Sequence, residues 1–241
     1  MRKFILFFIF ICCSFILNAK ELNFDDFSTY ATAENMRAFA KDISGFIGSS
    51  SFTTGRILGW GGFQLSAHTI YMPSPSKENT AFGTRDAGKF MPLIQGEIGL
   101  PFRLDGFIRA TSWDGLTIAG GGLKWGITKP TDMLYSFQPM VIVMAQNGVH
   151  RDFTITQYSA SLAVSFKTPY VVPYLGGGVD YTHFTAESSD DASLIGKRVF
   201  VTTPKAVLGL NFKLPSYFDL SVAANYAHYG LGAEASFGVR F

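Results

Sequence analysis

Cysteine and histidine are scarce in this chain of 241 residues. Its only cysteines, Cys12 and Cys13, both fall inside an apolar run at the N terminus. If that run is removed, no thiol remains for a disulfide framework, a thiolate zinc site or a cysteine nucleophile. No two of the histidines have the spacing of a helical metal-binding motif; they are His68, His150, His183 and His228. We therefore expect no metal site and no cofactor.

The N-terminal apolar run is too short to span a membrane as a helix. The basic residues Arg2 and Lys3 precede an apolar stretch over residues 4–17, and Ala19 then offers a small residue for cleavage. A spanning helix needs roughly 20 apolar residues. We predict a cleaved secretory signal over residues 1–19. The two cysteines also leave a lipoprotein signal as an alternative, although the residues before them are bulky.

Charged residues are few, and long apolar runs are absent after the N-terminal segment. Charged residues make up 16% of the chain, against about 25% in soluble domains. Removing Arg2 and Lys3 with the signal would lower the basic count from 20 to 18, which equals the acidic count of 18. No basic cluster suited to a phosphate backbone appears, so we expect no nucleic-acid partner. An exported, apolar chain without a spanning helix can satisfy its backbone in lipid as a closed β-barrel.

Alternation of apolar and polar residues predicts an all-β fold of about ten strands, with eight or twelve as alternatives. The clearest strand has Tyr158, Leu162 and Phe166 on one face and Gln157 and Ser161 on the other. Most strands have the nine to eleven residues that cross a bilayer when tilted. We predict an antiparallel transmembrane up-and-down barrel within residues 49–241. The strand ranges are 62–71, 90–101, 105–113, 115–127, 134–146, 153–167, 171–184, 199–213, 217–229 and 231–241.

The predicted connections differ in length between the two ends of the barrel. At one end all are short and contain proline; they cover 101–104, 128–133, 168–170 and 214–216. The other end carries the two longest loops, 72–89 and 186–197. Short periplasmic turns and longer outer loops are the usual asymmetry of outer-membrane barrels. This arrangement predicts that both termini lie in the periplasm.

A segment of different character precedes the first strand. Met36, Phe39, Ile43 and Ile47 recur at helical spacing within residues 32–47, which predicts an amphipathic helix. Thr32 is placed to cap this helix. The helix is too short and too charged to span a membrane. We expect residues 20–48 to plug the lumen; a helix that covers the periplasmic mouth, lies on the membrane surface or contacts a periplasmic partner is the alternative.

Charged and polar residues on the wet faces of the strands form the candidate lumen lining. Their signs are mixed, which favours ion pairs across a narrow lumen over a ring that selects one kind of ion. A barrel of eight to ten strands is scarcely wider than its own side chains. The tentative lining residues are Gln64, His68, Gln95, Glu97, Arg109, Asp180, Lys205, Asp219, Glu234 and Arg240.

The chain ends on a strand whose alternate residues are apolar, including Phe237, Val239 and the terminal Phe241. This ending resembles the assembly signal of bacterial outer-membrane β-barrels, and the whole chain resembles that class. The helix followed by a Gly-rich stretch and Gly62-Phe63-Gln64-Leu65 is also similar to a group of exported barrels of unassigned function. The resemblance implies residence in outer-membrane lipid and contact with the barrel-assembly machinery during biogenesis. It supplies no catalytic residue.

Two classes of function remain open. One is a small or gated pore for a small solute, with the helix as plug; the other is a structural or surface-interaction barrel that acts through its outer loops. Continuous water along the wet faces would favour the pore, and paired charges would favour the closed barrel. A lipid-modifying enzyme is a distant third, because parity puts Ser221 and Asn225 inward but His228 on the oily face. We therefore expect no enzymatic activity.

Overall fold

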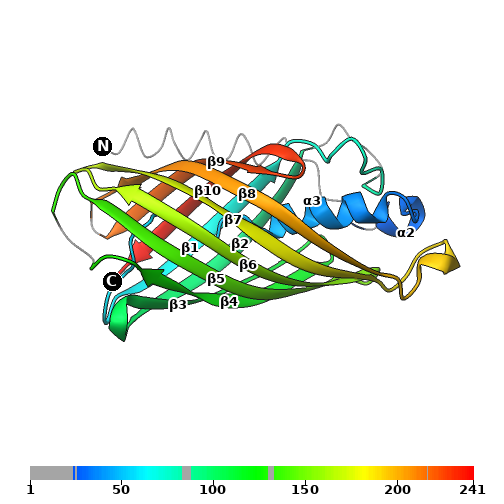
Figure 1. Cartoon of the computed structure of the whole chain (residues 1–241), viewed down its shortest axis with the longest axis horizontal. Helices are drawn as coiled ribbons and strands as arrows, with labels where there is room; N and C mark the ends of the chain where they lie inside the picture. Colours follow the sequence, from blue (N-terminus) through cyan, green and yellow to red (C-terminus); the bar gives the residue numbers. More distant parts are fainter. Residues whose placement is uncertain (1–23, 25, 83–87, 130–132, 216) are drawn as a thin grey trace.

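The chain forms a closed antiparallel β-barrel in the computed structural model (Figure 1). The structure describes residues 24, 26–82, 88–129, 133–215 and 217–241. The predicted signal over residues 1–19 lies outside the described residues. Within the described part of the chain, no helix has the length and apolar character needed to cross a membrane.

Ten strands follow one another around the wall, and β1 closes the barrel against β10. Each overlaps a predicted strand, and their ends differ from the prediction by at most three residues, so the predicted fold class is confirmed. The closure uses reciprocal backbone bonds, in which Phe63 N donates to Phe241 O at 3.0 Å and Phe241 N donates to Phe63 O at 2.7 Å. The strands are β1 (Phe63–Met72), β2 (Lys89–Leu100), β3 (Leu104–Trp113), β4 (Leu116–Gly126), β5 (Phe137–Val149), β6 (Phe153–Phe166), β7 (Val171–Ala186), β8 (Arg198–Lys213), β9 (Phe218–Ala227) and β10 (Gly230–Arg240).

The side chains alternate between a polar interior and an apolar exterior. In β6, Gln157 and Ser159 are buried, whereas Tyr158 and Leu162 are 56% and 55% exposed. The same period of two runs around the wall and leaves many large apolar side chains outside. Such a surface is unfavourable in water but matches hydrocarbon. Outward apolar residues from different strands include Leu65, Ile94, Ile108, Leu123, Val143, Leu162, Leu175, Leu208, Tyr226 and Phe237.

The two open ends of the barrel are unlike. The long-loop mouth carries the connection between β1 and β2 and the connection between β7 and β8, which includes a short 3₁₀ turn, Ala192–Leu194. The short-turn mouth, at the opposite end, carries the connections 101–103, 127–136, 167–170 and 214–217 and the C terminus. The second 3₁₀ turn, Pro101–Arg103, lies there.

Among the described residues, two helices precede the barrel wall: α2 (Asp26–Tyr30) and α3 (Met36–Gly48). The helix α3 begins four residues later than predicted, and α2 was not predicted. Thr32 N donates to Asn35 Oδ1 at 2.7 Å and Asn35 N donates to Thr32 Oγ1 at 3.3 Å. This reciprocal pair closes a separate turn before α3, so Thr32 caps that turn instead of the helix.

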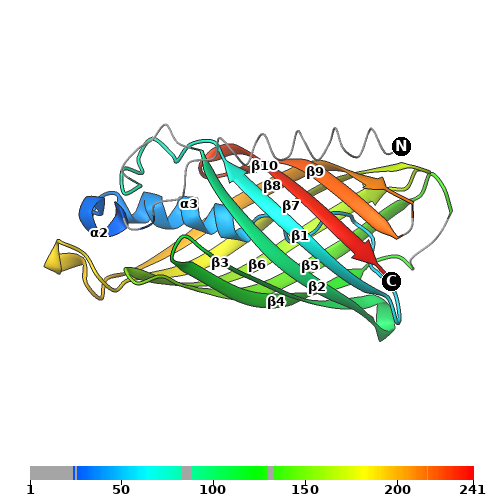
Figure 2. The same ribbon diagram turned by 180° about the vertical axis from the view of Figure 1, so that it is seen from behind.

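The helix α3 lies inside the barrel, and the chain after it continues through the lumen (Figure 2). At its C-terminal end, Ser49 Oγ donates to Gly45 O at 2.7 Å and the backbone becomes extended. Near the opposite mouth, Leu58 N donates to Asp105 Oδ2 at 2.5 Å. The wall therefore begins at Phe63, and residues 49–62, which we assigned to the barrel, precede it. Residues 49–57 lie in the lumen, and residues 58–62 form a turn at the short-turn mouth, where Trp60 is 80% exposed. We call residues 24 and 26–62 the plug.

The plug enters at the long-loop mouth and leaves at the short-turn mouth. The ring centroid of Phe24 lies 5.9 Å from those of Phe82 and Phe153, which are both at the long-loop mouth. Phe241 follows β10 at the other mouth. The helix α2 and the C terminus thus lie at opposite ends of the barrel (Figure 1). The N terminus itself lies outside the described residues, so the placement of both termini in the periplasm stays a prediction.

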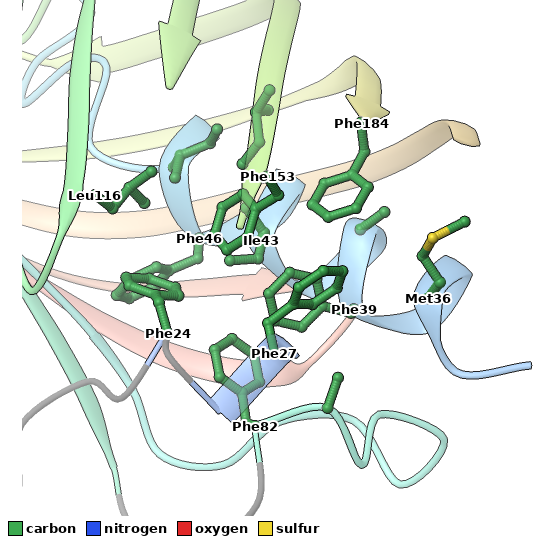
Figure 3. Packing of buried hydrophobic residues seen from close by; sticks show 14 of the residues in the cluster. Phe24, Phe27, Met36, Phe39, Ile43, Phe46, Phe82, Leu116, Phe153 and Phe184 are labelled. Carbon is green, nitrogen blue, oxygen red and sulfur yellow. The ribbon is translucent and has the colours of Figure 1, made fainter. Parts of the chain in front are cut away.

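Phenylalanine rings hold the helical part of the plug (Figure 3). The ring of Phe39 lies within 4.7–5.6 Å of four other rings, those of Phe27, Phe82, Phe153 and Phe184. These five rings come from α2, α3, the β1–β2 loop, β6 and β7, and all are buried. Tilted and edge-on contacts of this kind add to the stabilisation from burial. The predicted plug-helix residues Met36, Phe39, Ile43 and Ile47 all join this core.

Candidate functional site

The lumen is the candidate site, because nearly every charged group of the wall points into it. The ten residues proposed as lumen lining all occupy inward positions of the strands. Eight of them are buried, while Lys205 and Arg240 are partly buried. Most face the plug, other lumen side chains or both. The site is therefore an interface between the wall and the plug.

The end of α3 is held by donors from the wall. Gln146 Nε2 donates to Ile47 O at 2.8 Å, and Arg109 Nη2 donates to the same oxygen at 3.3 Å. Arg109 Nη1 also donates to Ser49 O at 3.1 Å. The last carbonyls of a helix have no partners within the helix and carry partial negative charge, so a guanidinium is a favourable partner. These bonds fix the C-terminal end of α3 in the middle of the barrel.

An ion pair lies beside the C-terminal end of α3. Lys205 Nζ lies 2.8 Å from Asp180 Oδ1 and donates to Gly48 O at 2.6 Å. A Cβ atom at position 48 would collide with the carboxylate of Asp180. Glycine at this position therefore lets α3 approach the wall closely enough for Lys205 to bind both Asp180 and the plug.

A hydroxyl cluster holds the middle of α3. Ser44 Oγ lies 2.7 Å from Thr182 Oγ1 and 2.8 Å from Thr203 Oγ1. Gln157 Nε2 donates to Ser44 O at 2.7 Å. Each of these polar groups is buried and each finds a partner, as burial of polar groups requires. The cluster joins α3 to β6, β7 and β8 at one point.

Two further carboxylates of the lumen, those of Glu97 and Asp219, have partners on the wall. Lys124 Nζ lies 2.5 Å from Glu97 Oε1, and Gln95 Nε2 donates to the same oxygen at 2.6 Å. Gln64 Nε2 donates to both oxygens of Asp219, at 3.1 and 3.0 Å. Lys124 thus offsets the charge of Glu97, whereas Gln64 gives Asp219 hydrogen bonds only, and these groups present no ring of a single sign to a passing ion.

His68 contacts a hydroxyl of the plug and a hydroxyl of the wall. Its Nδ1 lies 2.9 Å from Ser50 Oγ and its Nε2 lies 2.7 Å from Ser66 Oγ. Both ring nitrogens are therefore engaged by hydroxyls, one from the plug and one from β1. The ring links the plug to the wall and is buried.

The three residues of the discounted catalytic set do not come together in the described structure. Ser221 Oγ lies 2.8 Å from Tyr174 Oη, and Asn225 Nδ2 donates to Glu234 Oε1 at 2.8 Å. His228 lies in the turn after β9, outside both of these contacts. Among the described residues, no cluster of three His, Cys, Asp or Glu side chains has metal-binding geometry.

Among the cavities that the described residues leave beside the plug, two border charged side chains. One has 300 Å³ of empty space, some of it open to solvent, and is bordered by Gly48, Ser161, Lys205 and Glu234. The other, at the short-turn mouth, has 280 Å³ and is bordered by Arg56, Lys167, Lys213 and Arg240 among others. Each has room for roughly one or two water molecules in its interior. The described residues leave no wide passage beside the plug at these places.

Several residues of the site were absent from the sequence-based set. Lys124 and Gln146 follow the inward parity of their strands, so alternation alone could have identified them, as it placed Gln157 on the polar face of its strand. Ser44 and Asp42 were missed because polar residues on an amphipathic helix usually face water. In the lumen the polar side of α3 meets a polar wall instead, and Asp42 is fully buried.

The assembly-signal residues lie on the outer face at the end of β10. Phe237 and Phe241 are exposed, and Phe237 stacks on Phe218 of the neighbouring strand with ring centroids 5.4 Å apart. Val239 shares this outward face.

Comparison with known proteins gives structural matches alone: no model of a protein family matches the chain, and no curated protein sequence matches it. The barrel is similar to the N-terminal β-barrel domain of Pseudomonas aeruginosa OprF, with 15% identity, a TM-score of 0.39, and coverage of 76% of this chain and 99% of that chain. It is also similar to Yersinia pestis Ail in complex with the heparin analogue sucrose octasulfate. That match has 12% identity, a TM-score of 0.37, and coverage of 76% of this chain and 99% of that chain. Neisserial surface protein A matches with 17% identity, a TM-score of 0.35, and coverage of 75% and 96%. These three are bacterial outer-membrane barrels.

Proposed function

We propose that this protein is an outer-membrane barrel that is closed to solutes at rest and acts as a structural or surface-interaction protein. The observation that carries the proposal is the plug, which occupies the lumen from one mouth to the other and is bonded to the wall along its length. The paired charges Glu97–Lys124 and Asp180–Lys205 support it, because they leave no aligned charge for ion passage.

The apolar exterior supports the membrane setting. Large apolar side chains face outward on every side of the wall, and a lipid bilayer is the surrounding that stabilises them. We assign the long-loop mouth to the cell exterior, because longer connections on that side are usual for such barrels. The surface offered to a partner then consists of the 72–89 and 186–197 connections together with α2.

A gated pore is the second candidate, and the polarity of the inner wall favours it. If the plug moved, it would leave a lumen lined by groups such as Gln146, Gln157 and Arg109, which water can solvate. A wall that packed only against a permanent plug could be apolar throughout. The two candidates therefore differ in one respect: whether the plug leaves.

A disulfide bond between the plug and the wall tests whether the plug leaves the lumen. In a chain with Cys12→Ala and Cys13→Ala, the pair Ser44→Cys and Thr203→Cys places thiols where the two hydroxyl oxygens lie 2.8 Å apart. Planar-bilayer conductance is measured on the locked protein before and after reduction, and Ser44→Cys alone is the matched control. We expect no discrete current steps in either state. Current steps that appear only after reduction would favour the gated pore over the closed barrel. Current steps in the disulfide-locked protein would refute both proposed functions.

A further inference from the structure

Each of the four connections at the short-turn mouth carries an exposed aromatic side chain. In chain order these residues are Phe102, Tyr135, Tyr170 and Tyr217, and their exposed fractions lie between 68% and 86%. Phe102, Tyr135 and Tyr217 also have φ of 63°, 60° and 71°, in the left-handed region that is unfavourable for residues other than glycine. Rings that are exposed do not stabilise a fold by burial, so a contact outside the protein accounts for them best.

The plug adds a further ring to this mouth, that of Trp60. It is the most exposed of the three tryptophans of the chain, the others being Trp113 and Trp125. Girdles of aromatic residues at both rims are a usual feature of the wall of a membrane barrel. Trp60 differs from such residues because it belongs to the segment that fills the lumen.

The turn that carries Trp60 is fixed to the wall at the same end of the barrel as the C terminus (Figure 2). Gly62 N donates to Gly59 O at 3.1 Å, which closes a β-turn with Trp60 and Gly61 at its tip. Gly61 N donates to Gly99 O of β2 at 3.3 Å, and Gly99 N donates to Gly62 O at 2.7 Å. A Cβ atom at position 99 would collide with Gly59 O, so glycine there lets the turn lie against β2. The Trp60 ring is therefore held at the rim of the barrel.

The residues next to Trp60 continue the apolar exterior of the wall. Phe63, three residues further along the chain, is exposed and stacks on Phe241 with ring centroids 6.3 Å apart. On β2, Ile98 is exposed on the outer face, and Phe102 follows in the next connection. The surface around the Trp60 turn is thus continuous with the apolar surface that we assign to lipid.

Two features favour a lipid surface over a protein partner at this mouth. The exposed rings occur at every connection around the mouth, as a surrounding bilayer requires, whereas a protein partner would cover one side. The charges agree, because Arg103 and Lys129 are basic and lipid phosphates are negative. The described residues of the turn and the connections include no acidic residue; their ranges are 58–62, 101–103, 127–129, 133–136, 167–170, 214–215 and 217. Tryptophan and tyrosine, with an apolar ring and one polar atom, are also the side chains enriched at the membrane–water interface.

We propose that Trp60 inserts into the lipid interface at the short-turn mouth, so that the membrane itself holds this end of the plug. The inference rests on the proposed membrane setting of the barrel. Any movement of residues 49–57 that drew the turn away from the rim would also take the Trp60 ring out of the interface. Lipid therefore opposes the first step of plug release, in addition to the contacts inside the lumen.

Fluorescence tests the position of the Trp60 ring. In a chain with Trp113→Phe and Trp125→Phe, Trp60 is the single tryptophan. The full chain is refolded into phosphatidylcholine vesicles whose acyl chains carry bromine, a quencher, either near the headgroup or near the bilayer centre. We expect Trp60 to be quenched most strongly by bromine near the headgroup.

The matched control keeps Trp125, which is exposed on β4, as the single tryptophan. We expect lipid bromine to quench Trp125 as well, because the wall crosses the bilayer. Quenching of Trp125 without quenching of Trp60 would overturn this inference and leave the membrane setting in place. Quenching of neither tryptophan would overturn both.

Labelling of the lumen tests whether Trp60 holds the plug. In a chain with Cys12→Ala and Cys13→Ala, Ser51→Cys places one thiol in the buried, extended half of the plug. We expect Trp60→Ser to raise the rate at which this thiol reacts with a water-soluble maleimide in vesicles by about tenfold, the effect of losing partial burial of one aromatic ring. Trp60→Tyr keeps an interfacial ring and should react as the parent does. Tyr170→Ser removes a ring of equal exposure from the wall, and a rate in Trp60→Ser no higher than in this control would overturn the proposal.

Discussion

The two halves of the plug are held by different forces. The helical half, residues 26–48, packs phenylalanine and isoleucine side chains into an apolar core at the long-loop mouth. The extended half, residues 49–62, runs among serines, charged groups and the two cavities, with a smaller apolar cluster around Phe52 and Ile57. Burial of apolar surface is strong and non-directional, whereas each polar contact contributes little once exchange with water is counted. The helical half should therefore anchor the plug, and the extended half should yield first.

Removing a ring from each half tests this difference most strongly. Phe39→Ala deletes a ring that contacts four others, and we expect it to destabilise the barrel by about 3–5 kcal/mol. Phe52→Ala is the matched change in the extended half, where the ring has one aromatic neighbour, Tyr174, and the loss should be smaller. The free energy of unfolding in urea, measured on refolded protein, gives both values. An equal or larger loss in Phe52→Ala would mean that the halves are anchored alike.

The junction of the halves offers a second test. In Gly48→Ala the new methyl group collides with the Asp180 carboxylate, which the ion pair with Lys205 holds in place. We expect a loss of about 1–3 kcal/mol, the usual cost of overpacking. Gly177→Ala is the control, because a Cβ there meets nothing closer than 3.5 Å. The same urea measurement applies, and equal stability of the two variants would show that the junction is not tightly packed.

The smallest expected effect concerns the one carboxylate in the helical half that is fully buried. Asp42 Oδ2 accepts bonds from Ser76 N, Ser76 Oγ and Asn79 Nδ2, which ties α3 to the connection between β1 and β2. Burial raises the pKa of Asp42 above its ordinary value, and the bonds from Asn79 and Ser76 oppose that rise in part. The native state therefore binds a proton more readily than the unfolded chain does.

Because the native state binds this proton more readily, the contribution of Asp42 to the free energy of unfolding should increase as the pH falls through the raised pKa, and should decrease as the pH rises. Relative to Asp42→Asn, which cannot titrate, the parent should gain stability on acidification by at most about 1.4 kcal/mol per pH unit. Urea unfolding of both proteins at several pH values between neutral and mildly acidic measures the difference. A difference that does not change with pH, or that grows in the other direction, would contradict the raised pKa.

Much of the wall could be predicted because its signal is local. In strands such as β6 every second residue is apolar, and the period of two directly assigns which face meets lipid. The same parity put Glu97, Asp180 and Arg240 inward without any knowledge of their partners. The plug was harder to predict. The pattern of Met36, Phe39 and Ile43 predicted a helix, but nothing local showed that residues 49–57 continue through the lumen.

The sequence by itself predicted about ten strands, their faces and the helical stripe of the plug, since each depends on periodicity along a short stretch of chain, whereas closure with ten strands was decided by the structure. Tertiary structure alone decided which mouth the plug enters, that Asp42 and Ser44 are buried, and that Lys167, Lys213, Arg240 and Arg56 border one cavity. Those features bring together residues as far as 184 positions apart in the chain (240 − 56). Such contacts arise only when the barrel closes around its own N-terminal segment, because closure brings alternate strand ends to one rim and replaces water in the lumen with protein.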